Sequence, residues 1–198
     1  LKSRDGMIGM KADMGGGAAV IGAMGIIAGL ELPLHVVGLV PAADNMVSGN
    51  AYRPQDVVTA SNGKTIEIIS TDAEGRLLLA DALVYAKRYN PAAVVDIATL
   101  TGSCVVALGP LAAGLFSTDD TLTETIKSAA DATGERVWQL PLYAEYHKQI
   151  ESDTADVKNS GNRMGGVGTS AAFLQTFVDY PAWAHIDMAG MMKDLKDN

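Results

Sequence analysis

The chain has 198 residues, of which 48% are apolar and 19% charged, so it can build one domain with a sizeable core. Its formal net charge is −8 and no lysine or arginine cluster stands out, which argues against a nucleic-acid partner. The longest apolar stretch, residues 15–30, is shorter than the ~18–20 residues that span a bilayer, so we expect no membrane segment. The single cysteine, Cys104, excludes an internal disulfide and fits a reducing compartment.

The residue pattern predicts one helix and one buried strand in the first third of the chain. A glycine run at 15–17 leads into an Ala- and Gly-rich stretch that predicts a helix over 18–30, whose small side chains would let it lie close to a sheet. Residues 34–40 form a continuous apolar run of strand length, which is typical of a buried parallel strand. Residues 41–57 are rich in Asn, Gly and Pro and predict a loop.

Further along, helical and apolar segments alternate. We expect strands over 65–69, 92–97, 112–116 and 183–188, and helices over 77–89, 121–133 and 169–180. This alternation predicts an α/β fold, with a mostly parallel sheet covered by helices on both faces in three α/β/α layers. Ligands of such sheets bind beyond the carboxyl ends of the strands, and Asp72 and Asp187 both fall near such ends.

The segment from Thr71 to Leu77 (TDAEGRL) carries the clearest chemical signal. In an extended segment Asp72 and Glu74 would point to the same side, because side chains alternate along a strand. Two carboxylates aimed together repel unless a cation lies between them, and oxygen ligands suit Mg, Mn or Zn. Thr71 and Glu74 also match a helix capping box, so metal binding and capping both remain open for this segment.

Asp13 precedes the glycine run, and its role has alternatives of its own. An aspartate at this place can cap the following helix. The glycine run lacks both phosphate-loop patterns, G-x-G-x-x-G and G-x-x-x-x-G-K-[ST], so a phosphate-binding domain is weakly supported. Lys2, taken by itself, is typical of a solvated surface charge.

Histidine and cysteine chemistry is weakly indicated. His35, His147 and His185 lack the H-x-x-x-H spacing of zinc-protease helices. We interpret His35 and His185 as structural residues of apolar strands, and Cys104 as a core residue because Val105 and Val106 follow it.

Six segments in order resemble the leucyl aminopeptidase (cytosol aminopeptidase) family over nearly the whole chain. They are residues 1–3 (LKS), 10–16 (MKADMGG), 62–67 (NGKTIE), 70–77 (STDAEGRL), 96–102 (DIATLTG) and 183–190 (WAHIDMAG). The TDAEGRL stretch is highly specific for the family. Ser70 departs from the pattern, since Asn usually precedes Thr-Asp-Ala-Glu.

The resemblance implies an active site by residue matching. Asp13, Asp72 and Glu74 match ligands of two divalent metal ions, Mn or Zn; Lys2 matches the catalytic lysine and Arg76 the arginine that holds bicarbonate. The residues that match the wall of the substrate pocket are Met10, Thr99, Gly102, Ala189 and Met192, with a backbone group of Leu100 contacting the substrate.

The family's activity is hydrolysis of the N-terminal residue, preferably Leu or another apolar residue, from peptides by a metal-bridged hydroxide. The resemblance also implies a cytoplasmic homohexamer. It identifies residues 1–198 as a partial C-terminal catalytic domain, truncated at both ends and lacking upstream ligands, so we expect this fragment alone to be inactive. The alternative is a catalytically inactive assembly subunit of the same fold.

Overall fold

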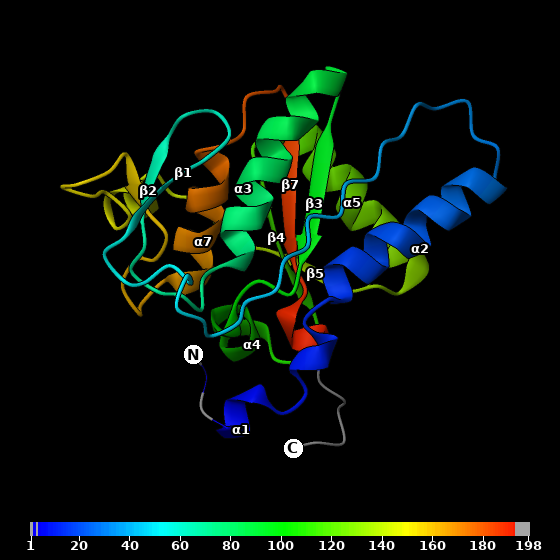
Figure 1. The fold of residues 1–198 in the computed structure, drawn as a ribbon. Helices are drawn as coiled ribbons and strands as arrows, with labels where there is room; N and C mark the ends of the chain where they lie inside the picture. Colours follow the sequence, from blue (N-terminus) through cyan, green and yellow to red (C-terminus); the bar gives the residue numbers. More distant parts are fainter. Residues whose placement is uncertain (1, 3, 193–198) are drawn as a thin grey trace.

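The computed structural model describes Lys2 and residues 4–192; Leu1 and Ser3 of the first matching segment lie outside the described residues. The helices, including three 3₁₀ turns (η), are α1 Arg4–Met7, η1 Met10–Ala12, α2 Gly15–Gly29, α3 Gly75–Ala86, η2 Lys87–Tyr89, α4 Gly102–Leu108, α5 Asp120–Thr133, α6 Glu145–Lys148, α7 Gly166–Gln175 and η3 Ala189–Met192. The strands are β1 Val57–Thr59, β2 Thr65–Glu67, β3 Val94–Ala98, β4 Ala113–Ser117, β5 Val137–Gln139, β6 Val157–Lys158 and β7 Trp183–Asp187 (Figure 1).

A four-stranded sheet of order β3-β7-β4-β5 forms the centre of the fold. Its β3–β7 and β4–β5 pairs are parallel, and β7 and β4 are antiparallel. A smaller sheet of order β1-β2-β6 joins an antiparallel pair to a parallel one. The α/β prediction is confirmed, with two of the three pairings in the main sheet parallel.

The largest core cluster lies where α3 and α7 meet both sheets. It unites Trp183 of β7 with Leu83 of α3, Phe173 of α7 and Ile66 of β2, all of them buried. Helix α5 packs instead on β4, β5 and β7 (Figure 1). The buried apolar side chains of α3 and α7 therefore attach these two helices to the sheets, since burial of such side chains contributes about 1.5–3 kcal/mol each.

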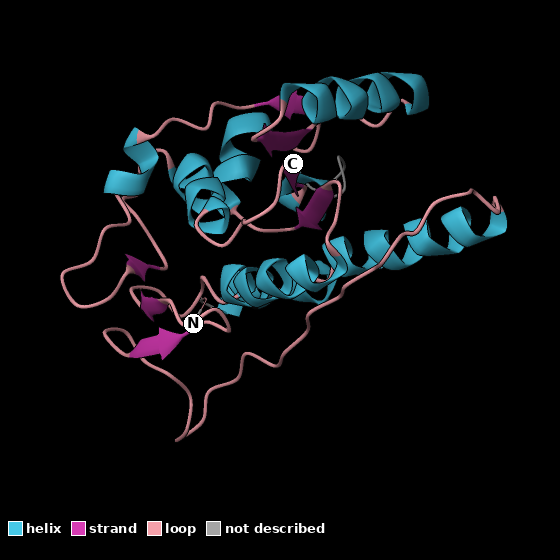
Figure 2. Ribbon diagram, turned by 90° about the horizontal axis from the view of Figure 1, so that it is seen from above, coloured by secondary structure: helices cyan, strands magenta, loops and turns pink. Residues whose placement is uncertain are grey.

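Helix α2 begins directly against β3 and then projects away from the body of the molecule (Figures 1 and 2). A Cβ atom added at Gly16 would lie 2.3 Å from the carbonyl oxygen of Ile97 and 2.7 Å from the Cα of Ala98. The side-chain-free backbone at this position thus permits the helix to contact the strand, as its small-residue composition predicts.

The predicted strand over residues 34–40 is not formed among the described residues. The segment runs back along α2 (Figure 2), with Gly38 against Met24 and Val40 against Gly17. It has no strand neighbour there, and a strand needs a hydrogen-bonded partner for its backbone. Its side chains are largely exposed, Leu34 by 67%, so the interpretation of His35 as a buried structural histidine is wrong as well.

The expectation that no segment reaches membrane-spanning length also needs correction. When η1, the turn at 13–14 and α2 are taken together, Met10–Gly29 forms a segment of 20 residues with a mean hydropathy of 1.4, and little of it is buried. By length and composition alone it could cross a membrane, because the 3₁₀ turn adds residues that the apolar run at 15–30 did not include.

The close approach at Gly16 predicts a large difference between two glycine substitutions in one helix. We expect Gly16→Ala to lower the free energy of unfolding by about 1–3 kcal/mol, because the new methyl group overlaps the β3 backbone. The matched variant is Gly22→Ala, where an added Cβ meets no atom within 4 Å. It should leave stability unchanged or raise it by about 0.5–1 kcal/mol. Urea denaturation of both variants measures the difference, and equal midpoints would contradict the packing.

Candidate functional site

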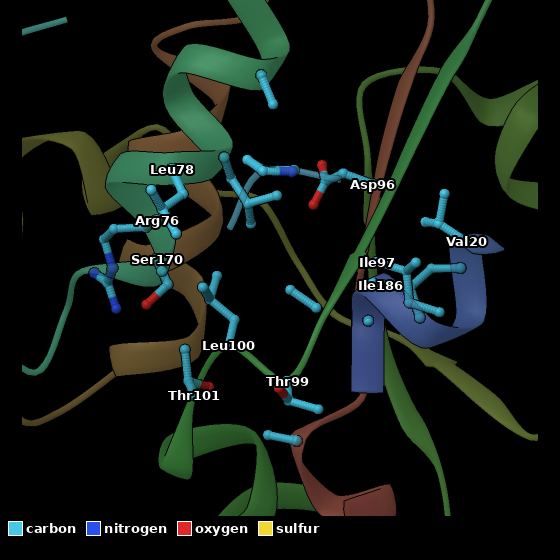
Figure 3. A pocket seen from close by; sticks show the side chains of 18 of the residues that line it. Val20, Arg76, Leu78, Asp96, Ile97, Thr99, Leu100, Thr101, Ser170 and Ile186 are labelled. Carbon is cyan, nitrogen blue, oxygen red and sulfur yellow. The ribbon is translucent and has the colours of Figure 1, made fainter. Parts of the chain in front are cut away.

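One cavity of about 1640 Å³ gathers every site residue that the sequence predicts. It opens between α2, α3 and the loops that follow the carboxyl ends of β3 and β7. Figure 3 shows Arg76 on the first turn of α3, and Thr99 and Leu100 directly after β3. The predicted residues in its wall are Lys2, Met10, Asp13, Asp72, Glu74, Arg76, Thr99, Leu100, Gly102, Ala189 and Met192.

Lys2 and Asp72 form an ion pair at the mouth of the cavity. The Lys2 Nζ donates to Asp72 Oδ1, although the two residues are 70 positions apart in the chain. Their side chains are 32% and 46% exposed, so water screens the pair. A lysine that would have been an ordinary surface charge by its sequence position therefore lies beside a predicted metal ligand.

Glu74 is the N-cap residue of α3, and the geometry here excludes both the capping box and the strand-like alternation that the sequence suggested for this segment. Its backbone is helical, with φ −75° and ψ −36°, and the start of the helix has no side-chain cap. Thr71 and Asp72 lie in a turn, so neither the Thr71 capping box nor strand-like alternation of Asp72 and Glu74 is present. The Oε2 atom of Glu74 is buried and has no hydrogen-bond partner among the described residues.

Asp13 also lacks the capping role that its position suggested. Helix α2 begins at Gly15 with Met14 at its N-cap and no side-chain cap. The Asp13 carboxylate instead accepts a hydrogen bond of 2.7 Å from the Thr99 hydroxyl, which ties η1 to the loop after β3. The capping explanation of Asp13 is therefore wrong, and the carboxylate faces the same cavity as Asp72 and Glu74.

The three carboxylates suit a divalent cation chemically but are not gathered around one point. Carboxylate oxygens are ligands that Mg, Mn and Zn accept, and the unpartnered Glu74 Oε2 is a buried acceptor that a cation would satisfy. Within Lys2 and residues 4–192, however, no three Asp, Glu, His or Cys side chains lie close enough to hold one ion. Like charges repel without a cation between them, and here the cation beside Asp72 is the Lys2 ammonium group.

Arg76 is a buried cation on the first turn of α3. It is only 8% exposed, and its Nη1 donates to the Asn159 carbonyl at 2.8 Å. Burial lowers the pKa of its guanidinium to about 10, against the opposing effect of the Asp187 and Glu74 carboxylates. The Nε atom has no partner among the described residues, so the group retains a donor for an anion.

A fully buried carboxylate, Asp187, holds the substrate side of the cavity together. It accepts from the Leu100 amide (3.1 Å), the Thr101 hydroxyl (2.7 Å) and the Ala189 amide (3.1 Å). These bonds join the loop after β3 to η3. Since the Leu100 N–H is used in this way, any backbone contact from Leu100 to a substrate would come from its carbonyl oxygen.

Behind the cavity, His185 is a structural histidine, as predicted. Its Nδ1 lies 2.5 Å from Asp96 Oδ1, and the Trp183 Nε1–H donates to the other Asp96 oxygen at 2.7 Å. Burial acts to lower the pKa of His185, but the adjacent Asp96 charge and hydrogen bond, with Asp187, outweigh it and raise the pKa. Cys104 is buried as predicted, and burial raises the pKa of its thiol to about 11, which fits an unreactive core residue.

Comparisons with known proteins match the chain over its whole length. Residues 1–198 match the catalytic domain of the cytosol aminopeptidase family. A probable cytosol aminopeptidase of Geobacter sulfurreducens is 53% identical over 190 residues, and one of Chlorobium luteolum is 56% identical over 192. Each alignment covers 96% of this chain but 38% of the relative, so the chain spans about two fifths of the length of these proteins.

The fold has a close counterpart among solved structures. A mutant of tomato leucine aminopeptidase superposes with a TM-score of 0.88 at 46% sequence identity. The superposition covers 94% of this chain and 37% of the tomato chain. The α/β architecture described above is thus the architecture of the corresponding part of that protein.

The buried His185–Asp96 pair predicts a stability that falls as the pH rises. Because the pKa of His185 is raised above its unfolded value of about 6.5, the stabilisation is fully present below that pH. It is lost as the pH rises through the folded-state pKa. Urea denaturation at pH 6 and pH 8.5 should show this loss in the unmodified protein and not in Asp96→Asn. His147→Gln is the control, since the His147 ring bonds the neutral Gln175 amide at 2.9 Å; a loss that persisted in Asp96→Asn would exclude the pair as its cause.

Proposed function

The chain belongs to the cytosol aminopeptidase family, and we propose that the protein containing it removes single residues from the amino ends of peptides. One observation supports this most: all eleven residues that match the family's site line a single cavity, although they come from segments up to 190 positions apart. Residues 1–198 would form part of the C-terminal catalytic domain of that protein.

Asp13, Asp72 and Glu74 would hold two divalent metal ions, Mn or Zn. When bound, such ions supply the Lewis acidity that polarises a peptide carbonyl and activates water. The chemistry of the donors supports this assignment: all three are carboxylates on one cavity wall, and the buried Glu74 Oε2 lacks a protein partner among the described residues. Neither the Asp13 nor the Glu74 side chain caps the helix that it precedes, so helix capping does not account for these two carboxylates.

Lys2 and Arg76 would provide positive charge during the reaction. Lys2 is a half-buried cation in the wall of the cavity, and it would stabilise negative charge that develops on the substrate carbonyl oxygen. Arg76, with its free Nε, would bind bicarbonate, which could carry a proton to the leaving amine. The two cations thus have separate tasks, one towards the substrate and one towards a small anion.

The pocket for the N-terminal side chain would be the part of the cavity between η1, the loop after β3, and η3. Met10, Thr99, Gly102, Ala189 and Met192 line it, and its mostly apolar character favours Leu and similar residues. Family membership extends the proposal to a homohexamer acting in the cytoplasm.

The metal assignment predicts that Asp72→Asn abolishes activity. In the full-length protein we expect hydrolysis of leucine-p-nitroanilide with added Mn²⁺, and a loss of at least about 10³-fold in kcat/KM in Asp72→Asn, because the neutral amide is a poor ligand. Asp179→Asn is the matched control, since Asp179 is likewise an exposed aspartate paired with a lysine, Lys87, and it should remain active. An Asp72→Asn enzyme with normal turnover would refute the metal role. An unmodified protein that assembles but hydrolyses no substrate would favour the alternative, a catalytically inactive assembly subunit.

The anion assignment predicts a bicarbonate response that depends on Arg76. Adding bicarbonate to bicarbonate-free enzyme should raise kcat, whereas Arg76→Met should show no response, with kcat lower by about 10²–10⁴-fold as for loss of a proton-transfer group. Arg88→Met provides the control, because that guanidinium stacks over Tyr85 at 4.7 Å and should not affect the response. Equal bicarbonate activation of Arg76→Met and the unmodified enzyme would exclude Arg76 as the binding group.

A further inference from the structure

The loop between β2 and α3, which carries Asp72, is held from inside by one side chain. The carboxamide of Asn159 is fully buried directly after β6. Its Oδ1 accepts from the amides of Ile69 (2.8 Å) and Ser70 (3.2 Å), and its Nδ2 donates to the carbonyls of Ser70 (2.7 Å) and Ala73 (3.4 Å). Four backbone groups of a five-residue stretch therefore bond this single amide, and one of them, the Ser70 carbonyl, also accepts from the Ala73 N–H at 3.3 Å.

The backbone of Asn159 extends the same contact to both ends of the loop. Its N–H donates to the Glu67 carbonyl at 2.9 Å, which continues the β2–β6 pairing to the last residue of β2. Its carbonyl accepts from Arg76 Nη1 at 2.8 Å, on the first turn of α3. Asn159 thus contacts the segment before Asp72, the segment between Asp72 and Glu74, and the arginine that follows them.

Only a carboxamide of this length satisfies the loop. Buried backbone N–H and C=O groups must be paired, and Asn presents an acceptor and a donor on one planar group. An aspartate would place a second acceptor against the carbonyls of Ser70 and Ala73. An alanine would leave the four backbone groups of the loop without the carboxamide that bonds them. The residue type is therefore explained by the loop, and Asn159 shares no segment with the motifs that match the family.

We propose that Asn159 is a positioning residue, which sets the place of Asp72, Glu74 and Arg76 through the backbone of the loop between β2 and α3. The proposal rests on the proposed metal role of the two carboxylates. Groups that orient metal ligands without touching the metal commonly change metal affinity 10- to 100-fold when removed. Asn159 would act in this range, since it holds the backbone on both sides of Asp72.

The test compares Mn²⁺ affinity in the full-length protein and its variants at a temperature well below unfolding. We expect Asn159→Ala to raise the Mn²⁺ dissociation constant 10- to 100-fold, and Asn159→Ser to raise it less, because a hydroxyl retains one donor and one acceptor. Thr123→Val controls for the loss of a buried polar hydrogen bond. The Thr123 hydroxyl is buried in α5, outside the loop between β2 and α3, and donates to the Asp119 carbonyl at 2.9 Å. It should lower stability and leave Mn²⁺ affinity unchanged.

A folded Asn159→Ala protein that binds Mn²⁺ within twofold of the unmodified protein would overturn the proposal while leaving the metal role intact. Failure of the unmodified protein to bind Mn²⁺ would overturn the proposed function, and the positioning role with it. Should neither Asn159 variant fold, hydrogen exchange of the unmodified protein decides. Ile69 and Ser70 amides protected well beyond the amide of Val47, which is 71% exposed, support the role, and exchange at the Val47 rate rejects it.

Discussion

The candidate site is built from loops, and a loop can be buried only if its backbone polar groups find partners. Two wholly buried side chains meet this requirement. Asn159 bonds the loop that carries Asp72, and Asp187 bonds the loop of Thr99–Gly102 together with η3. Asn159 directly follows β6 and Asp187 is the last residue of β7, so the loops that carry the cavity side chains are anchored to the two sheets.

This arrangement separates the chemistry from its support. The residues facing the cavity are exposed or half-buried, such as Asp72 and Lys2, and water can reach them. The residues behind them are fully buried, and each satisfies several backbone groups. Local helix signals offered capping as an alternative role for Asp13 and Glu74, but neither side chain caps the helix that it precedes. What the three carboxylates share is that they line the same cavity.

Elements with strong local signals could be predicted from the sequence. Helix α5 has Asp119 bonding the Leu122 amide at 2.6 Å at its start and Gly134 in the left-handed region, φ 77°, at its end. Strands β3 and β7 are mostly apolar, apart from Asp96 in β3 and His185 and Asp187 in β7, and lie in a sheet covered by helices. The cavity residues were located through the family motifs. Helix α4 was missed: its capping residue Thr101 lies in the segment 96–102, which was interpreted for its family motif and not for its secondary structure.

What depends on distant partners could not be predicted in the same way. Asn159 bonds groups 86 to 90 positions away, and nothing in its neighbours marks it as more than a polar loop residue. Residues 34–40 have the composition of a buried strand, but composition does not supply the neighbouring strand that a ladder needs. The same pattern is therefore a strand in β3, which pairs with β7, and an extended exposed segment at 34–40.

Helix α2 shows why hydropathy alone is a poor guide to surroundings. Its length and composition would suit a bilayer, and a membrane helix satisfies its backbone within itself, so it places no demand on the residue at position 16. Gly16 nevertheless stands where any side chain would overlap the β3 backbone, and Gly38 stands where the next segment meets Met24. Packing against protein explains both glycines, whereas lipid explains neither. Among the described residues, however, Gly16 is the one buried residue of α2, and Ile21 and Ile26 are largely exposed, so contact with the sheet explains this glycine and not the apolar composition of the rest of the helix.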